Sequence, residues 1–241
     1  MVSEKALTCE NHGLTNCFSC ASPIRSAPLI IAECGQNFCG NMELAKKLIS
    51  LAKENGADLV KFQLYDHNIL YKDHPEIPDV ALSFDEANML FDYGEEVGIE
   101  VFFSVFDVER VKWCEEIGVK RYKVAYSQSY NIDLLRAIRA ANKPILISSD
   151  GYQLGQTLYC VPQYPVKLSE LHLGDVDFNK LGFSDHTIGL DAAKIALARG
   201  AQIIEKHFAI DHQTGVDAQW SMTPEELKEL VRWSRVVNGV L

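Results

Sequence analysis

The sequence predicts an α/β fold, a (β/α)8 TIM barrel in which the helix between the fifth and sixth strands is missing. Three observations support this prediction. Short apolar runs alternate with amphipathic segments along the whole chain after residue 28. Most of these runs are apolar at nearly every position, as in parallel strands that are buried on both faces. The length of 241 residues is also ordinary for a barrel that forms one domain.

The eight strands are expected where short apolar runs end in polar residues. They are residues 29–34, 58–63, 100–106, 121–125, 144–149, 157–161, 181–184 and 202–207. A doubly wound open sheet is the alternative, but no glycine-rich phosphate-binding loop follows the first strand. The barrel is therefore the preferred fold.

Helical segments separate most of these strands. The segment that starts at Ser83 opens with a capping box, Ser83-x-x-Glu86, and stops at Gly98. The last helix starts after Thr223, with Pro224 in its first position. The helical ranges are 41–54, 83–97, 107–117, 131–141, 189–200 and the segment from 223 onward.

Only residues 150–156 separate the fifth strand from the sixth. A parallel crossover normally needs a dozen or more residues, and seven extended residues span about 23–25 Å at most. The chain can therefore return along a strand but cannot also form a helix. We expect a bare flank there, with Ile145 or Leu146 and Leu158 or Cys160 on the outer faces, and residues 166–178 as a loop with at most a short helix.

Composition limits the classes of function. The formal net charge is −10 and no basic cluster is present, which argues against nucleic acid or an anionic membrane as the main partner. No apolar run approaches the ~18 residues of a membrane span, and residues 1–28 lack the apolar core of a signal peptide. The 7 cysteines then indicate reduced thiols and a cytoplasmic protein.

Polar side chains gather at the C-terminal ends of the expected strands, which face the catalytic mouth in such barrels. They are Glu33, Lys61, Gln63, Ser104, Lys123, Ser184, His186, Glu205 and His207. A lysine within an apolar strand is costly unless it meets an anion. A buried salt bridge to Glu33 or Glu205 would account for one lysine. The whole set predicts a functional site, in which the lysines bind a phosphate or carboxylate and the hydroxyls and Gln63 add neutral hydrogen bonds.

His186 and His207 end consecutive strands that are joined by one helix. Two imidazoles placed in this way can share one divalent metal ion. The alternative is a pair of hydrogen-bonded core histidines.

The N-terminal segment, residues 1–28, is expected to be separate from the barrel of residues 29–241. Its cysteines and histidine, Cys9-x2-His12-x4-Cys17-x2-Cys20, have the ligand types and spacing of a small zinc or iron–sulfur site. A disordered extension with reactive thiols is the equal alternative.

Several motifs from about Leu29 onward are characteristic. They are Ile31-Ala32-Glu33-Cys34-Gly35-Gln36-Asn37, Gly56-Ala57-Asp58-Leu59-Val60-Lys61-Phe62-Gln63, Gly182-Phe183-Ser184-Asp185-His186-Thr187, Ile204-Glu205-Lys206-His207-Phe208, Gly215-Val216-Asp217 and Ser221-Met222-x-Pro224. In these motifs the chain resembles the N-acetylneuraminate (sialic acid) synthase family. The resemblance covers the barrel only, without the family's C-terminal antifreeze-like domain.

The resemblance implies that the barrel condenses phosphoenolpyruvate with an N-acylated sugar aldehyde to form a nonulosonic acid, with release of phosphate. It implies that phosphoenolpyruvate is bound by Lys61, Gln63, Ser104, Lys123 and Ser184. His186 and His207 would hold Mn2+ or Mg2+, and Glu33, Tyr164 and Asp217 would handle the sugar. Glu33 would also orient the attacking water, unless it only pairs with a buried lysine. We expect a homo-oligomer.

Three segments depart from the family pattern. Phe38 stands where the family usually has His, Ala125-Tyr126-Ser127-Gln128 replaces Gly-Ser-Gly-Glu, and Pro162-Gln163 stands where Ser or Asn is common. Groups for phosphate and metal are therefore largely kept, whereas groups for the sugar are altered. Two further functions remain open: a different metal-dependent aldolase or lyase, and a non-catalytic binding relative.

Overall fold

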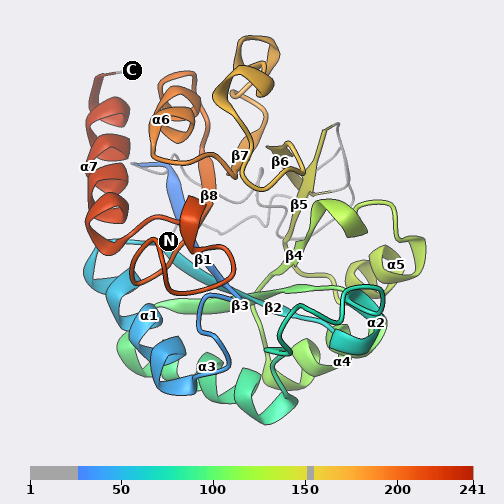
Figure 1. Ribbon diagram of the computed structural model, residues 1–241. Coiled ribbons are helices and arrows are strands. Elements are labelled where there is room, and N and C mark those ends of the chain that lie inside the picture. The colour runs from blue at the N-terminus through green and yellow to red at the C-terminus, as the bar shows by residue number, and fades with distance from the viewer. Residues whose placement is uncertain (1–26, 151–154, 241) are drawn as a thin grey trace, which may run out of the picture.

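The computed structural model describes residues 27–150 and 155–240, and these form a closed barrel of parallel strands (Figure 1). Each strand pairs with the next one in the chain, and β8 pairs with β1. The strands are β1 (Leu29–Gly35), β2 (Leu59–Leu64), β3 (Glu100–Val105), β4 (Tyr122–Val124), β5 (Ile145–Ser149), β6 (Gln156–Cys160), β7 (Gly182–Asp185) and β8 (Ile203–His207). The barrel and its eight strands are as the sequence predicts, with small shifts at the strand ends.

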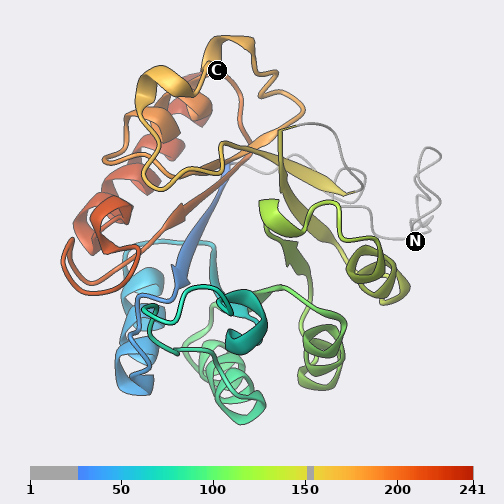
Figure 2. The ribbon, with the colours of Figure 1, turned by 45° about the vertical axis from the view of Figure 1, so that its right-hand side comes forward.

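Helices lie outside the strands (Figures 1 and 2). They are α1 (Met42–Glu54), α2 (His67–Leu70), α3 (Phe84–Val97), α4 (Val108–Ile117), α5 (Ile132–Ala140), α6 (Asp191–Ala198) and α7 (Pro224–Val240). Short 3-10 turns are η1 (Tyr126–Gln128), η2 (Leu168–Glu170), η3 (Leu173–Asp175) and η4 (Ala218–Trp220). Of the described helices, none is both long enough and apolar enough to cross a bilayer.

The predicted caps explain where helices begin and end. Ser83 accepts a hydrogen bond from the backbone N–H of Glu86, and the Glu86 carboxylate accepts one from the backbone N–H of Ser83, which completes the capping box of α3. Gly98 ends this helix in the left-handed conformation at φ 77°, which glycine adopts without steric cost. The short helix α2 was not predicted.

The connection from β5 to β6 consists of residues 150–155, and its described residues contain no helix. Residues 166–178 contain only the turns η2 and η3, as expected. The predicted outer faces were partly wrong, because Leu146 and Leu158 belong to an apolar cluster inside the barrel and Cys160 lines a pocket there. Tyr159 instead packs against the outer core, and its hydroxyl donates to the Leu171 carbonyl at 2.6 Å.

The barrel interior is arranged in layers along the strands. The N-terminal end is filled by an apolar cluster, which we call the plug: Leu29, Ile31, Leu59, Phe102, Leu146, Leu158 and Ile203. Gly182 completes this layer, since a Cβ there would lie 2.4 Å from Leu158 Cδ2. Side chains alternate along a strand, so the next inward residue lies two positions further on. On six of these strands that residue is Glu33, Lys61, Ser104, Ser148, Cys160 or Glu205, so the layer above the plug is mostly polar and charged.

Candidate active site

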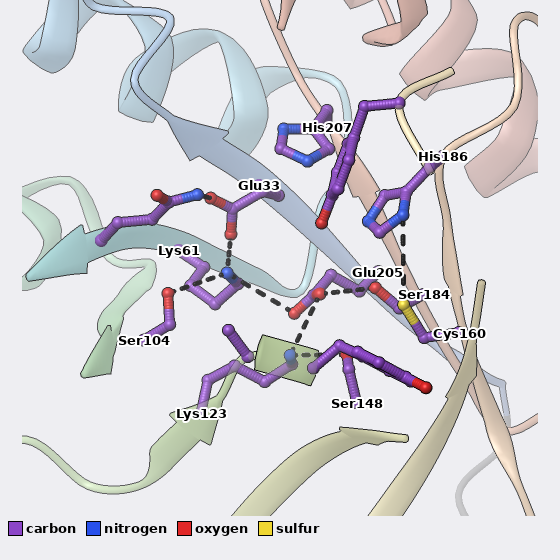
Figure 3. A pocket seen from close by; sticks show the side chains of 14 residues that line it. Glu33, Lys61, Ser104, Lys123, Ser148, Cys160, Ser184, His186, Glu205 and His207 are labelled. Carbon is purple, nitrogen blue, oxygen red and sulfur yellow. Dashed lines mark hydrogen bonds and ion pairs between the residues drawn. The ribbon is translucent and has the colours of Figure 1, made fainter. Parts of the chain in front are cut away.

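A small pocket opens at the C-terminal end of the barrel, on the plug side of which the interior is apolar, and its cavity volume is about 40 Å3 (Figure 3). Its lining residues come from all eight strands and the loops that follow them. They are Glu33, Lys61, Gln63, Ser104, Lys123, Ala125, Tyr126, Ser148, Cys160, Tyr164, Ser184, His186, Glu205 and His207. Nine of the residues predicted from the sequence are therefore brought together; the tenth, Asp217, lies against His207.

Four buried charges form a chain across the pocket floor. Lys61 makes an ion pair with Glu33 and lies 3.8 Å from Glu205. Glu205 in turn lies 3.4 Å from Lys123, so its carboxylate stands between the two lysines (Figure 3). The expectation that a salt bridge accounts for only one lysine was wrong, because both have a carboxylate partner. With all four groups ionised, the formal charges cancel.

Hydroxyl groups surround the same charges. Lys61 Nζ donates to Ser104 Oγ at 3.3 Å, and Lys123 Nζ donates to Ser148 Oγ at 2.7 Å. Ser184 Oγ donates to Glu205 at 2.9 Å. Each hydroxyl can rotate to donate to an incoming anion, so the floor offers two ammonium groups and three hydroxyls within one small volume.

Burial and the neighbouring charges shift the pKa values of the four groups. Burial raises the pKa of the Glu33 carboxyl, although the charge of Lys61 opposes this. Burial lowers the pKa of the Lys123 amine despite the nearby Glu205. Burial also acts to lower the pKa of Lys61, but Glu205 and Glu33 outweigh it and raise that pKa. Of the two carboxyl groups on the floor, Glu33 is thus the one that takes up a proton more readily.

Glu205 shows the opposite balance. Burial alone would raise the pKa of Glu205, but Lys123 and Lys61 together hold it below its usual value. Glu205 therefore remains an anion that keeps both lysines charged in a desolvated site.

The two histidines lie above the charged floor, with ring centroids 5.5 Å apart. His186 Nδ1 lies 3.1 Å from the Val161 carbonyl oxygen. Because a carbonyl only accepts, the neutral ring carries its proton on Nδ1 and leaves Nε2 free. Burial lowers the pKa of His186 to about 4 and that of His207 well below its usual value. Both rings are therefore neutral at pH 7, the form that binds metals.

Three further predicted residues border the histidines and Glu33. Asp217 Oδ2 lies 3.3 Å from His207 Nδ1, and burial raises the pKa of Asp217 to about 7. Tyr164 is 52% exposed, and its ring centroid lies 4.2 Å from that of His186. Gln63 Nε2 donates to Glu33 at 3.2 Å. Tyr164 and Gln63 thus line the pocket, whereas Asp217 lies beside His207.

Sequence reasoning placed Glu205 at the mouth without a role in binding substrate, and it did not include Ser148 or Cys160. Each lies two positions after a plug residue on its own strand, so each faces the interior at the level of Lys61. Glu205 also precedes His207 by two positions, and it was considered only as a partner for a lysine. The two-residue period was the signal that could have identified all three.

The departures from the family pattern have different structural consequences. Tyr126 lines the pocket, and its hydroxyl donates to Asp150 at 2.9 Å. Gln128 instead accepts a hydrogen bond from Asn131 at 2.9 Å, outside the pocket lining. Phe38 is buried against Phe62, with ring centroids 6.0 Å apart. Of the altered residues, Ala125 and Tyr126 are thus the ones that line the pocket.

The predicted second metal site lies outside the described residues, because Cys9, His12, Cys17 and Cys20 all precede residue 27. Across residues 27–150 and 155–240, no group of three or more His, Cys, Asp or Glu side chains is arranged to hold a metal ion.

Comparison with known protein families gives one clear result. The model of the NeuB family matches residues 48–157 and 155–241, which together cover most of the barrel.

Individual relatives agree with the family match. The chain is 31% identical to the N,N'-diacetyllegionaminic acid synthase of Campylobacter jejuni, over 88% of this chain and 77% of that one. It is also 31% identical to human N-acetylneuraminate-9-phosphate synthase, over 88% and 70% of the two chains. Among solved structures, the sialic acid synthetase of Leptospira borgpetersenii in complex with citrate superposes with a TM-score of 0.84 at 27% identity, and covers 89% of this chain and 85% of that one.

Proposed function

Because this chain belongs to the NeuB family, we propose that its barrel condenses phosphoenolpyruvate with an N-acylated sugar aldehyde, giving a nonulosonic acid and phosphate. The protein is an N-acetylneuraminate synthase-like transferase of carbohydrate biosynthesis. One observation carries the assignment of substrates: two desolvated lysines and three hydroxyls converge on the floor, beneath two neutral imidazoles.

The floor suits the anionic donor. Lys61 and Lys123 would bind the phosphate and carboxylate of phosphoenolpyruvate through charge-assisted hydrogen bonds, with Ser104, Ser184 and Gln63 as neutral donors. Because the plug excludes water from below, these charges act in a low-dielectric environment and orient the donor. Ser148, which already binds Lys123, extends this set.

The histidines suit a divalent metal ion. His186 and His207 would hold Mn2+ or Mg2+, which supplies Lewis-acid polarisation of the sugar aldehyde when bound. Both rings are buried and neutral, and the Nδ1 proton of His186 is bound by Val161, so the free Nε2 can serve as a ligand.

Glu33, Asp217 and Tyr164 would contact the sugar, and the two carboxyl groups would also take part in proton transfer. The raised pKa of Glu33 allows it to accept a proton from the water that adds to the central carbon of the donor. Asp217, whose pKa is raised to about 7, can accept or donate a hydrogen bond to a sugar hydroxyl. Tyr126, whose hydroxyl donates to the exposed Asp150, lines the pocket where the family pattern changes, so it is a candidate to influence which substrates bind.

Phosphate release tests the reaction. Protein, Mn2+ and phosphoenolpyruvate are incubated with a panel of N-acylated hexosamines, and phosphate is measured with and without each sugar. Sugar-dependent phosphate release is expected, and it should disappear in Lys61→Met. Sugar cleavage or condensation that needs no phosphoenolpyruvate would instead identify another aldolase or lyase, and an inert protein would identify a binding relative.

Metal binding needs its own test. His186→Ala and His207→Ala should each abolish Mn2+ binding in calorimetric titration while the barrel stays folded, because a two-ligand site loses most of its affinity with either imidazole. His212→Ala is the matched control, since that side chain is 48% exposed and lies near Glu226. Unchanged affinity in both site variants would remove the metal assignment.

We further propose a cytoplasmic homo-oligomer. The cysteines of the described region, Cys34, Cys39, Cys114 and Cys160, are free thiols, which supports a reducing compartment. Cell fractionation tests the location, and light scattering tests the assembly. A monomer at micromolar concentration would contradict the second part.

A further inference from the structure

A second buried ion pair lies beside the two histidines, on the outer side of the barrel wall. Asp185 on β7 and Lys206 on β8 are register partners, and their side chains are 0% and 1% exposed. Each immediately precedes one of the histidines in the sequence, so neither points into the pocket itself. Two desolvated charges are costly in this position, and a pair of apolar side chains would pack the wall about as well.

The pair holds one loop residue, Thr187, from both strands. Asp185 Oδ1 accepts hydrogen bonds from the backbone N–H and from the hydroxyl of Thr187, both at 2.8 Å. Lys206 Nζ donates to the Thr187 carbonyl at 2.6 Å and lies 3.1 Å from Asp185 Oδ2. Thr187 is itself buried.

These contacts fix the backbone on both sides of His186. Residues 185 and 187 are tied to each other through the Asp185 side chain, and residue 187 is tied to the residue before His207 through Lys206. The relative positions of the two imidazoles therefore depend on this link. Other backbone contacts also hold the histidines: the His186 carbonyl accepts from Val166, the His207 carbonyl accepts from Met222, and His207 is a register partner of Glu33 in the β1–β8 ladder.

We propose that Asp185 and Lys206 are positioning residues that set the spacing of His186 and His207, and thereby the metal affinity of the site. This inference depends on the metal role given to the histidines in the proposed function. The pair touches neither donor nor acceptor, and it acts only through the backbone that carries the two ligands. Mutation of polar groups that orient the ligands of a metal ion typically weakens metal affinity by about 10–100-fold.

The main test is the double variant Asp185→Asn/Lys206→Met, which removes both charges, leaves neither one unpaired and keeps similar side-chain volumes. Mn2+ affinity is measured by calorimetry, phosphoenolpyruvate affinity by titration in EDTA, and folding by thermal unfolding. We expect Mn2+ binding to weaken by about tenfold or more. Metal-free phosphoenolpyruvate binding should weaken much less than Mn2+ binding, because Lys61 and Lys123 lie on β2 and β4 and only Ser184 and Glu205 of the floor neighbour the pair.

A matched control removes another ion pair that joins neighbouring parts of the barrel wall. Arg121 and Glu100 lie at its N-terminal end, with a contact of 2.5 Å and side chains 12% and 14% exposed. Glu100→Gln/Arg121→Met should leave Mn2+ affinity unchanged. A second site variant, Thr187→Val, removes only the hydroxyl bond to Asp185, keeps both charges and should weaken Mn2+ binding to a smaller extent.

The possible results distinguish a failure of this positioning role from a failure of the proposed reaction. A folded double variant with the Mn2+ affinity of the parent overturns the inference, and so does an equal loss of Mn2+ and phosphoenolpyruvate binding, which would show general support of the barrel. If the double variant does not fold, unchanged Mn2+ affinity in Thr187→Val overturns it. A parent protein that binds no Mn2+ overturns the metal assignment and the inference together, while sugar-dependent phosphate release would still support the reaction.

Discussion

Glu205 determines how the two lysines behave. Its carboxylate is shared, lying 3.8 Å from Lys61 and 3.4 Å from Lys123, while Ser184 donates to it. A second anion entering the floor would therefore meet lysines that are already partly compensated. Phosphoenolpyruvate would be bound by rearranged hydrogen bonds in addition to bare charge, and protonation of Glu33 would relieve the excess of negative charge.

The lysines can be tested singly. Lys61→Met and Lys123→Met should each weaken phosphoenolpyruvate binding by about 1.5–3 kcal/mol, the scale of a hydrogen bond to a charged group. The double variant should lose less than the sum, because both amines would bind one ligand and both contact Glu205. Calorimetric titration measures all three, and parental affinity in both single variants would make the lysines purely structural.

The depressed pKa of His186 predicts a pH effect on stability. Its pKa is about 4 in the folded protein against a usual value near 6.5, so between these pH values the unfolded chain binds more protons. The free energy of unfolding of the metal-free protein should therefore fall as pH drops from about 6.5 to 4, by up to about 3 kcal/mol from this group.

Urea unfolding in EDTA across this pH range would measure that loss. His186→Asn should show a shallower dependence than the parent, whereas His212→Asn, with its exposed side chain, should follow the parent. Parallel pH profiles for His186→Asn and the parent would count against burial of a neutral imidazole.

At the scale of elements, the sequence predicted the strands well and their faces less well. Leu158 or Cys160 was assigned to the outside of the barrel, but both face the interior. A strand that is buried on both faces has no polar and apolar alternation, so its pattern does not reveal which side is inward. On other strands, polar residues near the C-terminal end did indicate the inward face. Lys61, Lys123, His186 and His207 accordingly lie in the pocket at the mouth, as predicted.

Helix ends were predictable where a cap was present. The helix α3 starts after Ser83 as its capping box predicts, whereas α2 has only four residues, too short a run for an amphipathic period to register.

The capping box gives a prediction at this scale. Ser83→Ala should lower the free energy of unfolding by about 1 kcal/mol, because the N–H of Glu86 loses its acceptor. Catalytic constants should not change, since α3 lies outside the barrel wall (Figure 1). Denaturant unfolding measures the loss, and Ser83→Asp, which keeps an acceptor, should restore most of it. A change in catalytic constants for Ser83→Ala would show coupling from α3 to the pocket.

At the scale of the whole molecule, the plug connects nearly all strands in one apolar cluster. Phe102→Ala should cost about 3–5 kcal/mol of global stability, because it opens a cavity where seven side chains meet. Coincident loss of fluorescence and circular dichroism would show one cooperative transition. Ile69→Ala, at a side chain that is 69% exposed, should stay within about 0.5 kcal/mol of the parent, and an equal cost in both variants would contradict the role of the plug.

The plug also affects the order in which the two substrates can bind. In the part of the chain that the structure describes, Phe102 and its neighbours fill the N-terminal end of the barrel, so access to Lys61 and Lys123 is from the C-terminal end, where Tyr164 and the histidines line the pocket. Phosphoenolpyruvate, which would bind Lys61 and Lys123 on the floor, must therefore bind before the sugar. A sugar that binds first would block access to these two lysines. Initial-velocity measurements should therefore show inhibition by high sugar concentrations that is relieved by phosphoenolpyruvate. The closed N-terminal end of the barrel thus predicts ordered binding, with phosphoenolpyruvate first and the sugar second.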